Sequence, residues 1–537
     1  MGYWSFYFLA KIGLYWGHVI GFDVWTNLLF ALALCVPVPP RLARLRPWRT
    51  ALAAFSAIAL LWYDVGLPPP SRVLQQWAEL AQFSSSYWME LLNRVWSWRV
   101  VGALALGATV YALLARRLRL GIVTVVLIAV LSWLPWPTQV PSGELPGDTA
   151  VGGDVPVAGL DPTPVAQAAS ASANAPVLER PQLDQALAGF YEAEKHRNVR
   201  FPQAQGGVPP FDLLILSICS LSWDDLATAG MTNAPLLRRM DLLFRQFNSA
   251  ASYSGPAVLR LLHGTCGQTP QADLYAPAPA DCYLFQQLQH MGYSSAMLLN
   301  HDGRYDGFAD QLQRQGGLDA KPADHRSAPI AMYGFDGSPI YDDYQVLSRW
   351  WHSQTDTDTA GTRRYALLYN TISLHDGNRR KGENAGNSLQ TWPARARTLF
   401  SDIENMLALV ENSGRPTVVV LVPEHGAALR GDGLQIPGLR ELPTPRITHV
   451  PAGVALLNFG PRPANTAPVM VDQVSSYNSL MAVVGALMQQ PNAPWATLKQ
   501  VGEALPAEGW VAENDGTIVM SEAGRLYTRT RDGSWRH

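Results

Sequence analysis

The segment VVVLVPEHGAALRGDG ends an aliphatic run with a carboxylate beside an imidazole, Glu424 and His425. A β-branched run without polar alternation is typical of a strand that is covered on both faces, as in α/β sheets. Functional residues of such sheets lie just past the C-terminal ends of the strands. The pair is therefore a candidate site, although a solvated or capping role is the ordinary alternative for such residues on a loop.

Two more predicted strands end in residues that could do chemistry. The strand FDLLILSIC ends at Cys219, and the segment YNTISLHDGN delivers His375 and Asp376. Each has a plainer interpretation, because a cysteine at a strand end is usually a core residue and His375 can simply hydrogen-bond to Asp376. Taken together with the Glu-His pair, these strand ends offer thiolate, carboxylate and imidazole, which are three of the ligand types of Zn²⁺.

Ser254 is a fourth candidate, in the segment SAASYSGPAVLRLLHG. It precedes Gly255, Pro256 and an amphipathic helical pattern, so we expect Ser254 to be the N-cap of a helix with the proline near the first turn. A helix cap is the plain interpretation of this serine. The N-terminus of a helix also favours anions, because its free N–H groups can hold a phosphoryl oxygen.

These residues need an α/β framework to meet, and the sequence after Phe211 predicts one. Strands are expected at residues 211–219, 295–300, 363–372, 416–422 and 453–459, and helices at 227–247, 393–412 and 479–488. Alternation of strands and helices predicts a largely parallel central sheet covered on both sides. Functional residues are then expected at one edge of that sheet.

The chain before Pro137 has a different character. Apolar stretches occur at residues 3–22, 24–38, 50–67, 100–115 and 120–136, most of them near the length of a spanning helix. No cleavage site of a signal peptide follows the first stretch. We therefore expect transmembrane helices over residues 1–136, a flexible linker rich in Pro, Ala and Gly over 137–177, and a catalytic domain over 178–537.

Arginine placement predicts the orientation in the membrane. One short loop carries Arg41, Arg44, Arg46 and Arg49, and another carries Arg116, Arg117 and Arg119. Both loops should be cytoplasmic, which puts the N-terminus inside and everything after Trp136 outside. The segment between the third and fourth stretches is expected to form an interfacial helix with membrane anchors, namely Trp88, Trp96 and Trp98.

Charge and cysteines narrow the function further. The net charge of -2 leaves no excess of positive charge for binding DNA or RNA, so no nucleic-acid partner is expected. Cys35 falls in an apolar stretch and should be an inert small hydrophobe, whereas Cys266 and Cys282 flank a proline-rich loop that a disulfide could close. Cys219 is left over, and coordination of zinc would explain an unpaired thiol in an exported domain.

The order of the segments LLILSICSLSWDDL, FNSAASYSGPAVLRLLHGTCGQTP, GFDGSPIYDD, LHDGN and VPEHGAALRGD, behind a membrane-helix region and a linker, resembles the BcsG-type cellulose phosphoethanolamine transferases. The resemblance covers essentially the whole chain. It implies an alkaline-phosphatase-like, or sulfatase-like, α/β catalytic domain in the periplasm of a Gram-negative bacterium. That family is similar to the lipid A phosphoethanolamine transferases, with Cys in place of an acidic metal ligand and Ser in place of Thr.

Carried over residue by residue, the resemblance implies roles for the candidates. The zinc ligands would be Cys219, Glu424 and His425, completed by the nucleophile Ser254. Tyr253 and His375 would be acid–base or supporting groups, Arg440 would contact phosphate, and Cys266 and Cys282 would form the family's disulfide. The long linker, and the chain after Asn378, depart from the family pattern.

The expected reaction is zinc-dependent transfer of phosphoethanolamine from phosphatidylethanolamine to the 6-hydroxyl of nascent cellulose, through a phospho-serine-type intermediate. The resemblance implies a multi-pass protein of the bacterial inner membrane, with membrane lipid, the cellulose chain and other subunits of the cellulose synthase complex as partners. An exported phosphodiesterase or sulfatase-like hydrolase and a non-catalytic scaffold of the export machinery are the alternatives.

Overall fold

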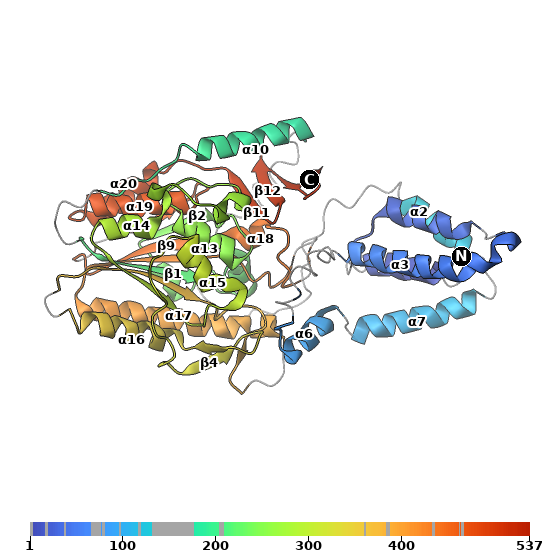
Figure 1. Ribbon diagram of the computed structural model, residues 1–537, viewed down its shortest axis with the longest axis horizontal. Helices are drawn as coiled ribbons and strands as arrows, with labels where there is room; N and C mark the ends of the chain where they lie inside the picture. Colours follow the sequence, from blue (N-terminus) through green and yellow to red (C-terminus); the bar gives the residue numbers. More distant parts are fainter. Residues whose placement is uncertain are drawn as a thin grey trace. The chain divides into compact units, whose positions relative to one another are not determined.

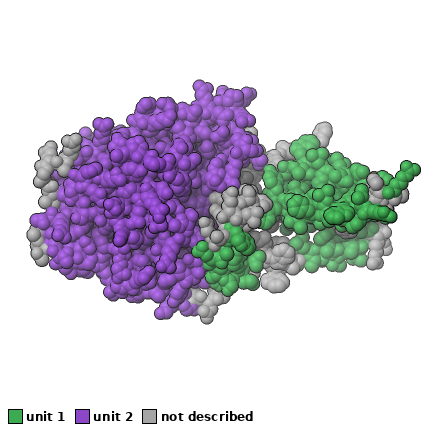
Figure 2. Space-filling view, in the orientation of Figure 1, with its two compact units in different colours: residues 1–155, 433–435 green, residues 156–432, 436–537 purple. Residues whose placement is uncertain are grey.

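The computed structural model describes residues 4–16, 20–36, 39–65, 77, 81–95, 98–115, 120–131, 177–202, 209–358, 361–382, 387–431, 435, 437–460, 462 and 467–536. Clustering of contacts divides the chain into two compact units, residues 1–155 with 433–435 and residues 156–432 with 436–537 (Figure 2). The predicted linker, apart from its last residue, lies outside the described residues.

The first unit is helical. Its α-helices are α1 (Trp4–Trp16), α2 (Val24–Cys35), α3 (Arg46–Asp64), α6 (Ser85–Val95), α7 (Trp98–Leu114) and α8 (Leu120–Leu131). Each of the five apolar stretches thus contains a helix, and α6 lies where an interfacial helix was expected. Of the helices in the described part of the chain, none combines the length and the apolar character that crossing a membrane requires.

The residues that predicted the orientation are only partly described. Arg41 and Arg44 lie in the 3-10 helix η1 (Pro40–Leu45), and α3 begins at Arg46. The second arginine group, 116–119, and position 96 lie outside the described residues. The topology therefore stays a prediction.

A buried ion pair explains the lysine inside the first apolar helix. Lys11 of α1 pairs with Asp64 of α3, and both side chains are almost fully buried. Asn27 of α2 joins them, accepting from Lys11 Nζ at 2.8 Å and donating to Asp64 at 2.9 Å. Paired charges of this kind are tolerated among apolar helices because each satisfies the other.

The second unit is built on a seven-stranded sheet of order β10-β2-β9-β8-β1-β6-β3. The strands are β1 (Asp212–Ile218), β2 (Leu242–Asn248), β3 (Ser294–Leu299), β6 (Tyr365–Thr371), β8 (Thr417–Pro423), β9 (His449–Leu457) and β10 (Val469–Val471). Strands β3, β6, β1 and β8 are mutually parallel, β10 is parallel to β2, and β9 is antiparallel to its neighbours β8 and β2. The largely parallel α/β sheet predicted from the sequence is confirmed.

The unbroken apolar runs follow from burial on both faces of this sheet. Along β8, Val418, Val420 and Val422 belong to one hydrophobic core, and Val419 and Leu421 belong to the other. Successive side chains of a strand point to opposite faces, so a strand between two cores needs apolar residues at every position.

Helices form both covering layers (Figure 1). One face is covered by α13 (Ser254–Leu262), α14 (Leu284–His290), α15 (Phe308–Arg314), α19 (Tyr477–Gln489) and α20 (Pro494–Ala504). The other is covered by α11 (Trp223–Thr228), α12 (Pro235–Arg238), α16 (Asp343–Thr355) and α17 (Ser388–Ser413).

Smaller elements complete the unit. They are α10 (Arg180–Glu194), α18 (Pro445–Thr448), β4 (Ile330–Tyr333), β5 (Pro339–Tyr341), β7 (Arg379–Arg380), β11 (Trp510–Asn514), β12 (Thr517–Glu522), β13 (Arg525–Arg529) and β14 (Trp535–Arg536). Helix α10 packs its apolar side against the four-stranded sheet β11-β12-β13-β14.

The helix predicted over residues 227–247 is wrong. The segment contains the end of α11, the short helix α12 and then the strand β2. Gly230, in the left-handed region at φ +64°, follows α11, and Pro235 starts α12. Apolar runs as short as LLF are compatible with either a helix or a strand, and here pairing with β9 and β10 decides for a strand.

The predicted disulfide is present between Cys266 and Cys282. Cys219 is unpaired and buried, and Cys35 is unpaired and exposed at the end of α2. The buried thiol is therefore available for another role.

Candidate metal centre and nucleophile

Two adjacent parallel strands bring the predicted ligands together. Cys219 directly follows β1, and Glu424 and His425 directly follow β8, with Ile218 and Pro423 in register. One potential ligand atom from each of Cys219, Glu424 and His425 lies within 4.8 Å of the others, and all three residues are buried. The carboxyl edge of the sheet therefore carries a compact S, O, N donor set.

Ser254 reaches this donor set from the helix that follows β2. Its Oγ lies 3.4 Å from Cys219 Sγ and 3.3 Å from His425 Nε2. The predicted N-cap role is wrong, because Tyr253 occupies the cap position and Ser254 is the first residue of α13. The helix therefore starts one residue earlier than expected, and Pro256 still falls in the first turn, where its missing N–H has no carbonyl partner to lose.

The tautomer of His425 suits a ligand role. Its Nδ1 lies 2.9 Å from the carbonyl oxygen of Gly426. Because a carbonyl only accepts, this contact favours the proton on Nδ1 and turns the lone pair of Nε2 towards Cys219 and Ser254. Nη1 of Arg440, which only donates, lies 3.0 Å from Nδ1 and 3.3 Å from Nε2 and opposes a proton on either nitrogen. A backbone acceptor that fixes the tautomer is the usual arrangement for a metal-binding histidine.

The carboxylate of Glu424 provides the test of whether a cation fits. Oε1 accepts hydrogen bonds from Asn370 Nδ2 and from Ser217 Oγ, the latter at 3.0 Å. Oε2 is buried and has no hydrogen-bond partner of standard geometry among the described residues, although the Ser254 hydroxyl lies close enough to oppose the rise that burial causes in the pKa of this carboxyl. A buried carboxylate oxygen without a partner is costly, so a cation that binds it would remove that cost. The residues present therefore fit a zinc ion.

The pKa shifts of Cys219, Glu424 and His425 also favour binding of a cation at this site. Burial, and then the charge of Glu424, raises the pKa of the Cys219 thiol to about 12, and burial also raises the pKa of Glu424. Burial, and then the nearby Arg440 guanidinium, lowers the pKa of His425. Without a cation the thiol stays protonated. A cation at the centre would stabilise the thiolate and carboxylate that it binds.

Arg440 and Tyr253 lie beside the donor set. Nη1 of Arg440 is 3.0 Å from Nδ1 of His425 and 3.3 Å from Oγ of Ser220, and the side chain is buried. Its guanidinium carbon lies over the ring of Tyr253, 5.2 Å from the centroid, and the Tyr253 hydroxyl donates to Glu441 at 2.8 Å. These contacts place a fixed positive charge at the site.

His375 is separate from the hydrogen-bonded cluster of Cys219, Ser254 and His425. Its Nδ1 lies 2.6 Å from the carbonyl oxygen of Asp376, so Nδ1 is the donor and Nε2 is free to accept a proton. Its ring packs on Phe335, with 4.8 Å between centroids. Burial, and then the charge of Arg440, lowers the pKa of His375 to about 4. Among the described residues, no hydrogen bond joins His375 to Ser254 or to the donor set.

The sequence reasoning missed the residues that orient the ligands. Ser217 and Asn370 hold Glu424, and the buried carboxylate of Asp225 accepts from the N–H groups of Ala427 and Leu429 in the loop after His425. The available signal was a polar residue inside an otherwise apolar strand, as in LLILSI and ALLYNT. A buried polar residue requires a partner, and here the partner is the site.

Comparison with known proteins gives consistent matches along the chain. The models of the cellulose biosynthesis protein BcsG N-terminal and C-terminal domains match residues 4–134 and 167–535. Cellulose biosynthesis protein BcsG of Escherichia coli (strain K12) is 36% identical over 558 residues, covering 99% of this chain and 95% of that protein. The protein of the same name from Salmonella typhimurium (strain LT2) is 37% identical, with the same coverage.

A solved membrane protein is similar at a much lower level. The integral membrane protein lipooligosaccharide phosphoethanolamine transferase A from Neisseria meningitidis is 14% identical, covering 90% of this chain and 95% of that chain. Its TM-score is 0.40, which is too low to support an inference about fold or function.

Proposed function

Because the chain belongs to the BcsG family of cellulose biosynthesis proteins, we propose that its second unit transfers phosphoethanolamine to nascent cellulose. One observation carries the proposal. The Ser254 hydroxyl meets Cys219 and His425 at the edge of the sheet where Glu424 keeps a buried oxygen without a partner. This arrangement combines a nucleophile with a site for a cation.

The cofactor in this proposal is zinc, held by Cys219, Glu424 and His425 with the Ser254 oxygen completing the set. When bound, a zinc ion lowers the pKa of a hydroxyl and stabilises negative charge on phosphoryl oxygens. Thiolate, imidazole and carboxylate donors suit zinc better than magnesium or calcium, which prefer oxygen ligands alone.

The chain's own residues supply the remaining chemistry. The Ser254 oxygen bonds to phosphorus and loses its proton, while the bond from phosphorus to the diacylglycerol oxygen breaks and that oxygen gains a proton. In the second half, a glucan 6-hydroxyl attacks the phosphorus and loses its proton, while the bond from phosphorus to Ser254 breaks and the Ser254 oxygen gains a proton. Each half is balanced by one proton lost and one proton gained.

His375 is the proposed carrier of that proton. Its free Nε2 accepts a proton from an attacking hydroxyl and gives it to the leaving oxygen. A pKa of about 4 makes the imidazole a weak base, but the negative phosphoryl group of a donor offsets the charge of Arg440 and raises that pKa. Arg440 and the N–H groups at the start of α13 would hold phosphoryl oxygens.

The donor in this proposal is phosphatidylethanolamine. We place the first unit in the bacterial inner membrane, with the N-terminus and the arginines 41–49 in the cytoplasm and the catalytic domain, in the alkaline-phosphatase-like class, in the periplasm. The apolar helices and the arginine asymmetry support this placement. The other subunits of the cellulose synthase complex are the proposed protein partners.

Detection of a covalent intermediate tests the proposal. Enzyme incubated with phosphatidylethanolamine and no glucan should gain about 123 Da, by the chemistry of nucleophilic catalysis, on the peptide that contains Ser254. Ser254→Ala should lose the adduct and the transfer while it keeps zinc, and His375→Ala should form the adduct about 10² to 10⁴ times more slowly. Transfer by Ser254→Ala at the wild-type rate would contradict the mechanism. Free phosphoethanolamine without modified glucan would favour the hydrolase, and neither product would favour the scaffold.

A further inference from the structure

A chain of buried hydrogen bonds connects the end of β3 to the proposed metal centre. Nε2 of His301 lies 3.0 Å from Oδ1 of Asn370 on β6, and Nδ2 of Asn370 donates to Oε1 of Glu424. The same Nδ2 is 3.3 Å from Oγ of Ser217. His301 is 7% exposed, and Asn370 and Glu424 are each 1% exposed. Water therefore cannot replace these partners freely.

A backbone group sets the direction of every bond in this chain. The N–H of Gly303 donates to Nδ1 of His301 at 3.2 Å, so Nδ1 holds the lone pair and Nε2 holds the proton. Nε2 must then donate to Asn370, which makes the facing amide atom the oxygen. The amide nitrogen is thereby turned to Glu424, and Oε1 of that carboxylate is the atom that accepts.

The position of Gly303 admits no other residue without a shift. Its φ is +66°, and an added Cβ would lie 2.9 Å from the side chains of Leu299 and Ala309. Glycine is the residue that adopts this conformation without strain. The local turn thus holds the N–H against His301.

We propose that His301 is a positioning residue for the metal centre. By fixing the amide of Asn370, His301 keeps Oε1 of Glu424 hydrogen-bonded. Oε2, which has no partner of standard geometry among the described residues, is then left for the cation. This inference rests on the metal of the proposed function. Burial lowers the pKa of His301 to about 4, so the ring stays neutral and the direction of the bonds is constant at neutral pH.

Loss of the imidazole removes this constraint. Without that donor the buried amide oxygen of Asn370 loses its partner, and the amide is held only by the bonds of its nitrogen to Glu424 and Ser217. Removal of a group that orients a metal ligand typically weakens binding by about 10- to 100-fold. A group that only filled space at this position would affect stability without affecting the metal.

Zinc affinity of the full-length protein, measured by competition with a chromogenic chelator, tests the inference. His301→Leu should bind zinc about 10-fold more weakly, at the lower end of the range for direct partners of a metal ligand, because His301 acts through Asn370. His301→Gln should recover most of the affinity, because its amide can donate to Asn370 and accept from Gly303. His263→Gln is the control, since His263 lies at the other end of α13 from Ser254 and contacts Gln315, and it should bind as the wild type does.

A spectroscopic measurement separates positioning from folding. The thiolate-to-metal absorption of the cobalt-substituted protein should shift in His301→Leu and return in His301→Gln. Should His301→Leu fail to fold, Asn370→Asp provides the second test, because a carboxylate facing Glu424 should weaken zinc binding at least as much. Wild-type affinity and an unchanged cobalt spectrum in folded His301→Leu or Asn370→Asp would overturn the inference. Wild-type protein that binds no zinc would instead overturn the proposed function, and the inference with it.

Discussion

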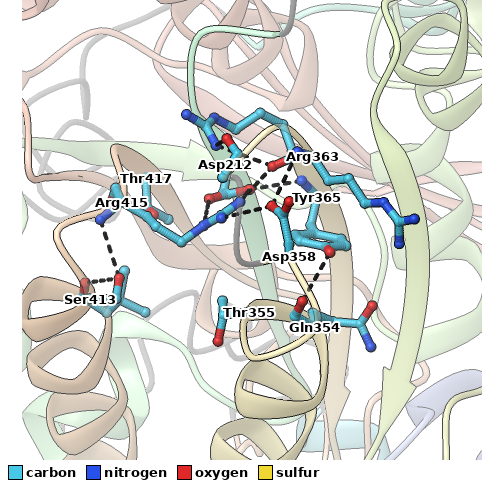
Figure 3. Close-up of polar contacts among 12 residues, drawn as sticks. Asp212, Gln354, Thr355, Asp358, Arg363, Tyr365, Ser413, Arg415 and Thr417 are labelled. Carbon is cyan, nitrogen blue, oxygen red and sulfur yellow. Dashed lines mark hydrogen bonds and ion pairs between the residues drawn. The ribbon is translucent and has the colours of Figure 1, made fainter.

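The two edges of the central sheet bury polar groups in different ways. At the amino edge, where β1, β6 and β8 begin, Arg415 donates to Asp212 through Nε at 2.8 Å and through Nη2 at 3.1 Å, and to Asp358 through Nη1 at 3.1 Å (Figure 3). Asp212 also accepts from the N–H of Tyr365, and Asp358 accepts from the N–H of Arg363. Each carboxylate of this cluster is matched by donors.

At the carboxyl edge of the same strands the groups do not match one another. Glu424 keeps an oxygen without a partner among the described residues, and the neighbouring thiol and imidazole are held in their neutral forms. The difference teaches that burial of charge alone does not mark a functional site. A cluster whose members satisfy one another stabilises the fold, whereas an unmet carboxylate oxygen beside a thiol and an imidazole supports the proposed cation site.

The largest effect is expected from a substitution at the carboxyl edge. Cys219→Ala removes one of three protein ligands, so zinc content should fall from about one per chain to near zero and activity should fall to background. The metal-free protein should remain folded, because the strands keep their cores. Elemental analysis checks this, with Cys35→Ala as the matched control for loss of a free thiol. Full zinc occupancy in Cys219→Ala would remove that residue from the site.

The next largest effect is expected from a substitution at the amino edge. Arg415→Met leaves Asp212 buried and unpaired, which should lower the free energy of unfolding by about 4 kcal/mol. Zinc affinity of the folded fraction should not change. Urea denaturation with zinc titration checks both, and Arg239→Met is the control, because its pair with Glu411 is well exposed and should contribute less than about 1 kcal/mol. Loss of zinc at unchanged stability would contradict the division between the edges.

The same division explains what could be predicted from the sequence. Cys219, Glu424 and His425 each stand directly after an apolar run, so a local pattern and the rule for parallel strands were enough to bring them together. The pair of Asp212 with Arg415 joins residues 203 positions apart, and no local signal connects them. The strand β2 was mistaken for a helix because its identity depends on pairing with β9 and β10, which a single segment does not encode.

Acid should weaken the carboxyl edge through a buried histidine. The pKa of His301 is lowered by burial to about 4 in the folded chain, whereas an unfolded histidine titrates near 6.5. The unfolded chain therefore takes up the proton first. The stabilisation is fully present above about pH 6.5 and is lost as the pH falls through about 4, up to about 3 kcal/mol for this group. The unfolding free energy of the metal-free protein from pH 7 to pH 4 checks this. His301→Gln should remove only the share of this one histidine, because burial also lowers the pKa of His375 and of His449 to about 4, and His196→Gln at an exposed position should leave the curve unchanged.

The smallest effect compares one hydroxyl at each edge. Ser217 Oγ donates to Glu424 Oε1 at 3.0 Å, and Thr417 Oγ1 donates to the carbonyl of Arg415 at 3.0 Å. Both residues are fully buried in central strands, and each bond is expected to contribute about 1 kcal/mol. Ser217→Ala should bind zinc roughly fivefold more weakly, because only Asn370 then holds the Glu424 carboxylate.

Thr417→Val should instead lower the stability of the folded protein. The unfolding free energy should fall by no more than about 1 kcal/mol, since the Arg415 carbonyl keeps a hydrogen bond from Asn458, and zinc affinity should stay at the wild-type value. Chelator competition and urea denaturation check both variants, and zinc affinity should fall in Ser217→Ala alone. If Thr417→Val weakened zinc binding as much as Ser217→Ala did, the two edges would be coupled through the strands, and the separation of a structural edge from a binding edge would be wrong.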